Sequence, residues 1–173
     1  NLGTTGGEGE FVEWAPGEGP AFAPAVRGMG VSFLASSRGQ SRDRTKTGGE
    51  ITIDVPGLGT LDTLTLSLWF KPVGPNAPAR LLYLGPCWDL YVSGSAVAIK
   101  VRHDGKDHNR YPPRNQRVAV EGRWNFIALT LDREAGASRL YHALLGDEPR
   151  LAATWDDIPA YDKGEATLEI GNL

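Results

Sequence analysis

The stretch from Leu61 to Pro72 alternates between large apolar and mostly small polar residues. Within Thr63–Phe70, every second residue is a leucine or a phenylalanine, and the residues between them are threonine, serine and Trp69. Because successive side chains of a β-strand point to opposite faces, this pattern predicts a strand with four large apolar side chains on one face. Burying that face would contribute about 6 to 12 kcal/mol of gross transfer free energy, so a second layer is expected to cover it.

A second long apolar strand is predicted from Trp124 to Asp132, which reads WNFIALTLD. Both of its faces are apolar, which is typical of a central strand. One face carries Ile127, Leu129 and Leu131, and the other carries Trp124, Phe126 and Ala128. We expect this strand to belong to the opposing sheet and to cover the leucines of the first strand.

Short β-rich runs separated by glycine and proline continue along most of the chain, at intervals typical of a sandwich or barrel. Further strands are predicted at 28–36, 51–55, 79–85, 88–93, 95–103, 117–120, 151–155 and 165–170. A long polar loop is predicted from Asp104 to Gln116. The segment from Asp132 to Pro149 could form a helix, but Gly136 interrupts it, so we favour a hairpin.

These patterns predict an all-β protein of about eleven strands. A length of 173 residues fits one domain. Residues 1–26 are rich in glycine and proline, and we expect an extended lead-in packed on a sandwich formed by residues 27–173.

The order of the strand motifs resembles that of the laminin-G-like (pentraxin-like) branch of the concanavalin A-like lectin/glucanase superfamily. The motifs are GVSFL, TLSLWFKP, LLYLG, LYVSGSAVAIKV, RWNFIALTLD, RLYHA and LEIGN, between Arg27 and Leu173. The resemblance implies a jelly-roll sandwich of two antiparallel sheets, built from packing motifs with no catalytic group among them.

The chain departs from that family in two places. LYHALLGDE replaces a shorter hairpin, and family members continue after the IGN-like motif into a closing strand beside the first strand, whereas this chain ends at Leu173. We therefore expect a missing C-terminal segment or a protein partner to complete the sheet, unless N-terminal residues already fill that position.

Overall charge and composition exclude several classes of protein. The net charge of −3 argues against general nucleic-acid binding, and there is no apolar run long enough to span a membrane. Cys87 is the single cysteine, so an internal disulfide is excluded. Because the chain begins with Asn1 rather than Met, we expect part of a larger protein that is extracellular or periplasmic.

Positive charge is concentrated in two segments, and this charge pattern suggests a ligand. Lys100–Arg123 contains seven basic residues against three acidic ones, and Arg38–Lys46 adds four against Asp43. If the two segments lie at the same rim of the sandwich, they form a basic patch that suits an acidic or sulfated glycan. The alternative is that both segments are solvated loops without a ligand. The candidate ligand-binding residues are Arg42, Arg44, Lys46, Arg102, Lys106, Arg110, Tyr111, Arg114 and Trp155. Trp155 is a candidate only if it is exposed, and burial is favoured for each tryptophan taken singly.

The sequence also contains candidate metal ligands and residues of the types that the superfamily's enzymes use. The resemblance implies a calcium ion at a sandwich rim, for which Asp104, Asp107 and Asn109 offer oxygen ligands; the alternative is a solvated acidic loop. The E-x-D-x-x-E strand of the superfamily's glucanases is absent. Tyr141 and His142 suggest a lyase pair, but neighbours along a strand point to opposite faces.

Taken together, the sequence predicts a non-enzymatic carbohydrate-recognition or adhesion module that binds glycan weakly through rim loops. Two alternatives remain. One is a structural or assembly module whose sheet is completed by another segment or chain, and the other is a glycoside hydrolase or polysaccharide lyase of the same fold.

Overall fold

The computed structural model describes residues 9–13, 21–24, 29–32, 49–72, 79–165 and 167–171, with side chains from residue 51 onward within these ranges. The strands are β1 (Gly9–Glu13), β2 (Ala21–Pro24), β3 (Met29–Ser32), β4 (Gly49–Asp54), β5 (Thr63–Phe70), β6 (Ala79–Leu84), β7 (Trp88–Ser93), β8 (Ala96–His103), β9 (Lys106–Arg110), β10 (Asn125–Asp132), β11 (Ala137–Leu144), β12 (Arg150–Trp155) and β13 (Thr167–Ile170). Two 3-10 turns, η2 (Leu58–Thr60) and η3 (Arg114–Gln116), interrupt the connections.

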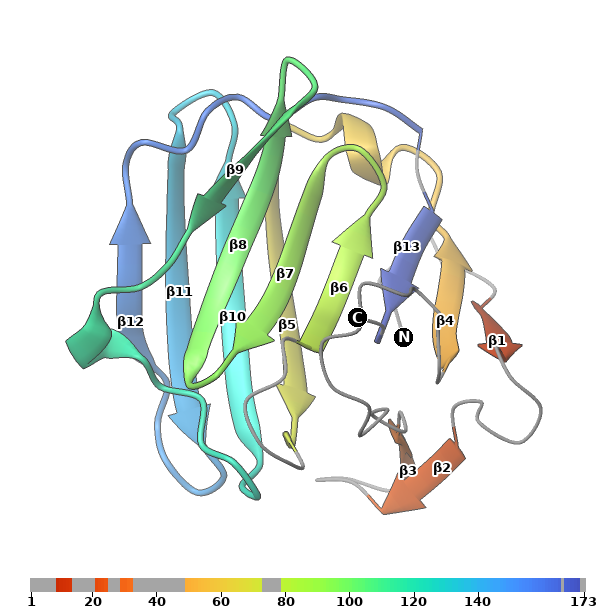
Figure 1. Cartoon of the computed structure of the whole chain (residues 1–173), viewed down its shortest axis with the longest axis vertical. Helices are drawn as coiled ribbons and strands as arrows, with labels where there is room; N and C mark the ends of the chain where they lie inside the picture. Colours follow the sequence, from red (N-terminus) through yellow and green to blue (C-terminus); the bar gives the residue numbers. More distant parts are fainter. Residues whose placement is uncertain are drawn as a thin grey trace, which may run out of the picture.

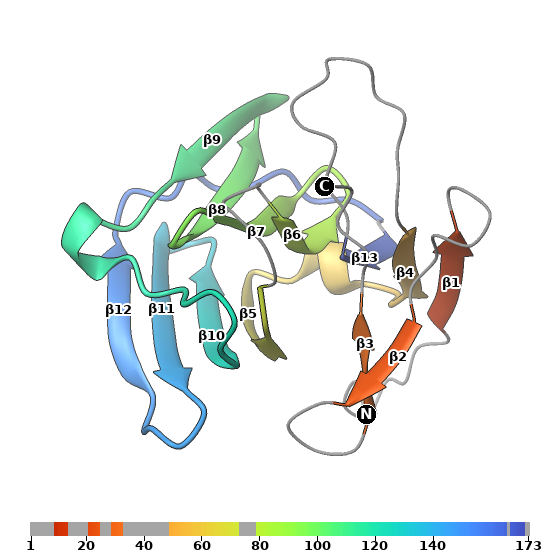
Figure 2. The same ribbon diagram turned by 60° about the horizontal axis from the view of Figure 1, so that its bottom comes forward.

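The strands form a sandwich of two antiparallel sheets, which confirms the predicted all-β class (Figure 1). The large sheet has seven strands in the order β1-β4-β13-β6-β7-β8-β9, and the small sheet has four in the order β12-β11-β10-β5. Figure 2 shows β6 to β9 as one layer over the other layer formed by β5, β10, β11 and β12. A separate pair joins β2 to β3.

The inner faces of the two sheets form one apolar core. Leu90 of β7 and Ile99 of β8 belong to the same buried cluster as Ile127 and Leu129 of β10. Strand β10 alternates between buried and half-buried residues along its whole length, as the sequence predicted for the Ile127 face. The core therefore lies between β7–β8 on one side and β10–β11 on the other.

The leucine strand and the Trp124 strand lie side by side rather than face to face. β5 pairs with β10 in the small sheet, with Leu66 opposite Leu129, so the expectation that one covers the other is wrong. The apolar faces of β5 and β10 both point toward the large sheet, which covers them. Alternation shows which face of a strand is buried but does not identify its neighbour.

Two local predictions between residues 104 and 120 are also wrong. Much of the expected polar loop is β9, which pairs with β8 after a tight turn at Asp104 and Gly105. The expected strand at 117–120 is an irregular segment that β10 holds in place: the Asn125 side chain bonds the backbone N–H and carbonyl of Val120. The hairpin favoured after Asp132 is confirmed by β11.

N-terminal residues form strands where little regular structure was expected. β1 pairs with β4 at the edge of the large sheet, while β13 lies between β4 and β6 (Figure 1). β2 pairs with β3, which lies within the first strand predicted from the sequence. The family's closing strand was expected beside that strand, and β2 occupies one of its two edges. The domain boundary at residue 26 stays a prediction.

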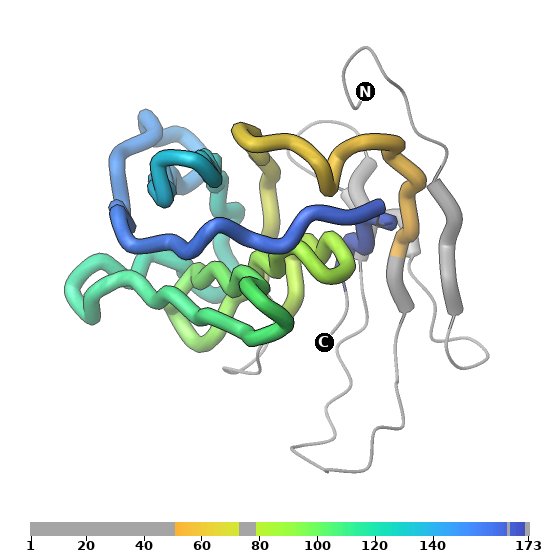
Figure 3. The backbone as a smooth tube through the Cα atoms, turned by 90° about the horizontal axis from the view of Figure 1, so that it is seen from above, coloured from red at the N-terminus to blue at the C-terminus, as the bar shows by residue number. Residues whose placement is uncertain are grey.

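The connection from Asp156 to Glu165 crosses one end of the sandwich between the two sheets (Figure 3). Tyr161 is buried there, and its hydroxyl donates to the Leu61 carbonyl at 2.8 Å. Burial is the main cause that raises the pKa of Tyr161 to about 12. Asp162 N–H bonds the Arg102 carbonyl at 2.7 Å, so this segment ties η2 and β8 together. Within the described ranges, none of the helices has the length and apolarity that a membrane span requires.

The position of β10 in the centre of the core predicts unequal costs for two leucine truncations. Leu129 is fully buried (0% exposed), whereas its neighbour Leu66 on β5 is only half-buried. Leu129→Ala should lower the free energy of unfolding by about 2–5 kcal/mol, and Leu66→Ala by clearly less, in denaturant titrations. Equal losses would contradict this placement of the two strands.

Candidate functional site

The outer face of the large sheet carries a group of polar and aromatic side chains. Because Leu90, Ile99 and Val101 face the core, alternation turns their neighbours on β7 and β8 outward. The cross-strand pairs on this outer face are Asp89 with Lys100, Tyr83 with Asp89, and Arg102 with Asp107. These side chains come from four consecutive strands, β6 to β9.

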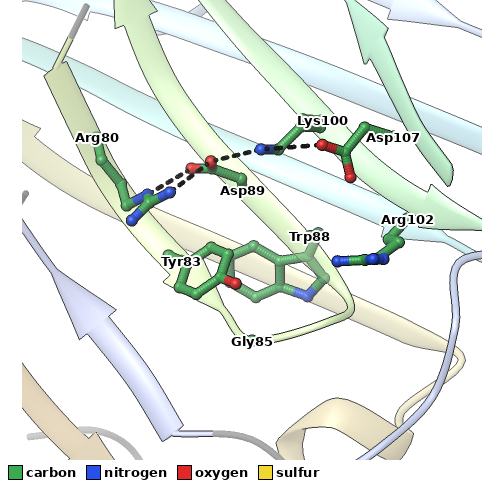
Figure 4. Close-up of a pocket in the computed structure, with 8 residues that line it drawn as sticks. All are labelled: Arg80, Tyr83, Gly85, Trp88, Asp89, Lys100, Arg102 and Asp107. Carbon is green, nitrogen blue, oxygen red and sulfur yellow. Dashed lines mark hydrogen bonds and ion pairs between the residues drawn. The ribbon is translucent and has the colours of Figure 1, made fainter. Parts of the chain in front are cut away.

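A shallow cavity of about 80 Å³ lies among these side chains, near the turn between β6 and β7 (Figure 4). Its lining combines three cations, two carboxylates and two aromatic rings. The cations are Arg80, Lys100 and Arg102. We call this hollow the sheet-face cavity.

Asp89 organises the sheet-face cavity. It is 3% exposed, and its carboxylate accepts two hydrogen bonds of 3.2 Å from the Arg80 guanidinium. Lys100 Nζ lies 3.4 Å from the same carboxylate and 3.6 Å from Asp107. The Arg80 guanidinium also lies 4.1 Å from the centre of the Tyr83 ring, a cation–π contact. Arg80 and Lys100 are thus both committed to carboxylates.

The side chains of Arg102 and Trp88, unlike those of Arg80 and Lys100, have donor groups without a partner among the described residues. The Arg102 side chain is exposed and forms no hydrogen bond or ion pair with the described residues. Trp88 is 2% exposed, yet its indole Nε1–H has no hydrogen-bond acceptor among them. In Figure 4 the Arg102 guanidinium lies beside the nitrogen-bearing edge of this indole.

A tyrosine pair extends the same face toward β9. The hydroxyl of Tyr91 lies 2.8 Å from the Tyr111 hydroxyl and 3.2 Å from Asn109 Oδ1, within hydrogen-bond distance of both. Burial, followed by the Tyr111 hydrogen bond, raises the pKa of Tyr91. The two rings meet edge to face at 6.0 Å, and Tyr111 is 48% exposed. Tyr111 therefore offers a fixed aromatic surface to solvent.

The structure distributes the predicted basic residues over several places. Arg102 lines the sheet-face cavity, but alternation along β9 turns Lys106 and Arg110 to the opposite side from Asp107. Arg110 bonds Asp157 at 3.0 Å, and Arg114 is exposed in η3.

The other predicted ligand-binding residues do not line the sheet-face cavity or fall outside the described residues. Trp155 is buried, the alternative that the sequence favoured over an exposed binding position, and its indole donates to the Tyr111 carbonyl at 3.3 Å. Arg42, Arg44 and Lys46 fall outside the described residues. A binding role for any of these residues stays a prediction.

The three predicted calcium ligands have separate partners. Asp107 pairs with Lys100, and Asn109 bonds Tyr91. Asp104 instead lies near His103 and Asp162. One possible metal-ligand atom from each of these three residues lies within 4.8 Å of the other two.

Both oxygens of Asp162 already accept hydrogen bonds, from the backbone N–H groups of Gly105 and Asp104. These bonds, the one from Gly105 first, lower the pKa of Asp162. Calcium binding at Asp104, Asp107 and Asn109 stays a prediction.

Sequence reasoning missed much of the sheet-face cavity, namely Arg80, Tyr83, Trp88, Asp89 and Lys100. A signal was present: Asp89 and Lys100 interrupt the otherwise apolar runs WDLYV and AVAIKV. A charged residue within a buried strand requires a partner of opposite charge. Two such interruptions in consecutive strands predict a pair.

Comparison with known proteins supports the fold. No family model matches the sequence, and the search of curated proteins finds no match. Among solved structures, the binding domain of botulinum neurotoxin DC in complex with rat synaptotagmin II aligns at a TM-score of 0.60 and 11% identity. The same domain in complex with SialylT aligns at 0.61 and 12%. Each alignment covers 99% of this chain but 40% of the toxin chain.

A bacterial module gives a further alignment. The CBM40 of the Ruminococcus gnavus IT-sialidase, bound to α2,3 sialyllactose, aligns at a TM-score of 0.50 and 22% identity. This alignment covers 69% of our chain and 71% of that module. At such identities the likeness establishes the fold alone, an antiparallel β-sandwich. Membership of the laminin-G-like branch stays a prediction.

The two aspartates that pair with arginines predict different contributions to stability. Asp89→Asn leaves Arg80 and Lys100 without their shared charge in a largely buried position, so the free energy of unfolding should fall by about 1–3 kcal/mol. Asp157→Asn breaks an exposed pair with Arg110 and should cost less than about 1 kcal/mol. Denaturant titration of both variants measures the difference, and a harmless Asp89→Asn would show that this network does not hold the face together.

Proposed function

We propose that the chain is a non-catalytic carbohydrate-binding module that binds glycan on the outer face of its large sheet. The observation that carries this proposal is the sheet-face cavity with the exposed guanidinium of Arg102, together with the exposed ring of Tyr111, which contacts Tyr91 farther along the same face. Neighbours of the same fold include the toxin domain in complex with SialylT and the CBM40 bound to α2,3 sialyllactose.

The chemistry of this face suits a sugar. Hydroxyl groups of a sugar both donate and accept hydrogen bonds, and the exposed charged side chains of the cavity, Arg102 and Asp107, offer both functions. Tyr111 offers a flat aromatic surface against which the apolar face of a sugar ring can pack. Because the cavity is shallow, we propose weak binding, near millimolar for one copy, that is strengthened by multivalent display.

The state of the acidic groups supports a non-catalytic role. Glycoside hydrolysis requires a carboxylic acid whose pKa is raised so that it can donate a proton. Hydrogen bonds, from Lys163 to Asp62 and from the Gly105 N–H to Asp162, instead lower the pKa of these two carboxyl groups.

The suggested lyase pair is divided between two environments. His142 bonds Asn125 at 3.0 Å, and burial lowers its pKa. It lies opposite Ile127, whereas Tyr141 lies opposite Ala128, which places the two side chains on opposite faces of the small sheet. Binding therefore fits the described residues better than hydrolysis or elimination.

We further propose that the module belongs to a larger extracellular or periplasmic protein with an adhesive role. Glycan polymers and glycoconjugates are met mainly at cell surfaces, and weak single-site binding becomes useful when many copies face such a surface.

A glycan array followed by titration calorimetry tests the proposed function, using lactose and 3′-sialyllactose as first ligands. Tyr111→Ala should weaken binding by about 3–10-fold, since it removes one aromatic contact. Tyr141→Ala is the matched control, because Tyr141 lies on the outer face of the small sheet, and it should bind as the wild type does. Absence of binding across the array, or equal losses in both variants, would refute the proposal.

Assembly through β5 is a second candidate. Among the described strands only β10 pairs with β5, and the inward leucines of β5 are half-buried. The strand has eight residues without a charge, which leaves its outer edge open to pairing with another strand. We propose that this edge accepts a strand from a further segment of the parent protein or from a partner.

A lysine on that strand tests the assembly proposal. Thr65→Lys should abolish any self-association or partner capture seen in sedimentation velocity, because a charge on an edge strand opposes pairing. Thr130→Lys, on the central strand β10, is the control. If Thr65→Lys leaves an observed association unchanged, β5 is not the contact.

A further inference from the structure

We propose that the sheet-face cavity binds an anionic group of the glycan, a carboxylate or a sulfate, between the indole N–H of Trp88 and the guanidinium of Arg102. This inference rests on the proposed function and specifies the ligand of the same site. It moves the anion-binding position from the rim loops, where the sequence placed it, to the outer face of the large sheet.

Trp88 gives the first argument. Its indole lines the cavity and packs in the core, but its Nε1–H has no acceptor among the described residues. Buried polar groups almost always have a hydrogen-bond partner, and those without one often mark a ligand or water position. An indole nitrogen can only donate, so the missing partner must be an acceptor.

The charge balance gives the second argument. Arg80 and Lys100 share the carboxylates of Asp89 and Asp107, and Arg80 also lies 3.7 Å from Glu169, so both cations are already paired with carboxylates. Arg102 remains as the cation without a pair among the described residues that line the cavity. A planar guanidinium binds carboxylate and sulfate-like oxygens with strong, charge-assisted hydrogen bonds.

The geometry gives the third argument. Figure 4 shows the Arg102 guanidinium beside the indole nitrogen of Trp88, so two kinds of donor converge at one end of the cavity. A volume of about 80 Å³ is well below the roughly 300–1,000 Å³ of pockets that enclose a whole ligand. The cavity can therefore take one functional group, while the sugar ring that carries it lies outside on the sheet face.

The indole N–H signal of Trp88 in a nitrogen–proton correlation spectrum tests the inference directly. The complete chain is labelled with nitrogen-15 and titrated with glucuronate, glucose 6-sulfate and glucose. Sodium sulfate and sodium acetate at equal ionic strength separate binding of an acidic sugar from binding of any small anion. Trp88→Phe, which keeps an aromatic ring in the core, assigns the signal by its loss, and triple-resonance assignment serves if that variant does not fold.

We expect glucuronate, glucose 6-sulfate or both to shift the Trp88 signal in a saturable way, with glucose at least about tenfold weaker. Arg102→Gln should weaken the acidic sugar by about tenfold or more, whereas Arg139→Gln, an exposed cation on β11, should not. The relative response to the two sugars identifies carboxylate or sulfate as the preferred group.

Three results would overturn the inference. One is a Trp88 signal that no acidic sugar moves while other signals on β6 to β9 respond to glucose and glucuronate alike; the proposed function would then survive without the anion site. Another is an equal effect of sodium acetate or sulfate, which would indicate unspecific anion binding. The third is no response anywhere to any glycan, together with an empty array, which would remove the proposed function as well.

Discussion

The packing of two antiparallel sheets against each other is the constraint on which the rest of this structure depends. β7 and β8 contribute Leu90 and Ile99 to the core, and β10 contributes Ile127 and Leu129. Each sheet buries one face only because the other sheet covers it. The inward or outward position of the side chains on β7 to β9 then follows from the alternation along each strand, whereas a bulge in β6 between Arg80 and Leu82 turns Arg80 to the outer face.

The candidate site is a consequence of that alternation. Once the apolar residues of β7 and β8 face the core, Asp89, Lys100 and Arg102 must face outward together. Asp89 lies where solvent barely reaches, so it requires Arg80 and Lys100 as partners. Arg102 and the Trp88 N–H remain as donors without a side-chain partner among the described residues. The proposed glycan-binding face is therefore carried by the strands β6 to β9 themselves.

Much of this fold could be predicted from the sequence, because alternation and turn residues are local signals. β5 and the buried face of β10 follow directly from spacing, and Gly136 argued correctly for a hairpin around β11. What could not be predicted was pairing: the β5 and β10 ladders were expected to face each other and instead share a sheet.

For the candidate site too, features that depend on the local sequence could be predicted, and features that depend on contacts between strands could not. Arg102 and Tyr111 were found from charge and aromatic content, while Trp88 and Asp89 were missed because their importance depends on neighbours from other strands. Arg110 was grouped with Arg102 as one basic patch, but strand β9, unrecognised in a polar segment, turns it away to Asp157.

Hydrogen–deuterium exchange with and without a bound glycan tests the central claim most directly, namely that the outer face of the large sheet is the binding surface. Ligand should slow exchange in peptides from residues 79–111, which contain β6 to β9 and Tyr111. Protection confined to peptides of the small sheet, residues 125–155, or to the basic segment 38–46 would contradict the account.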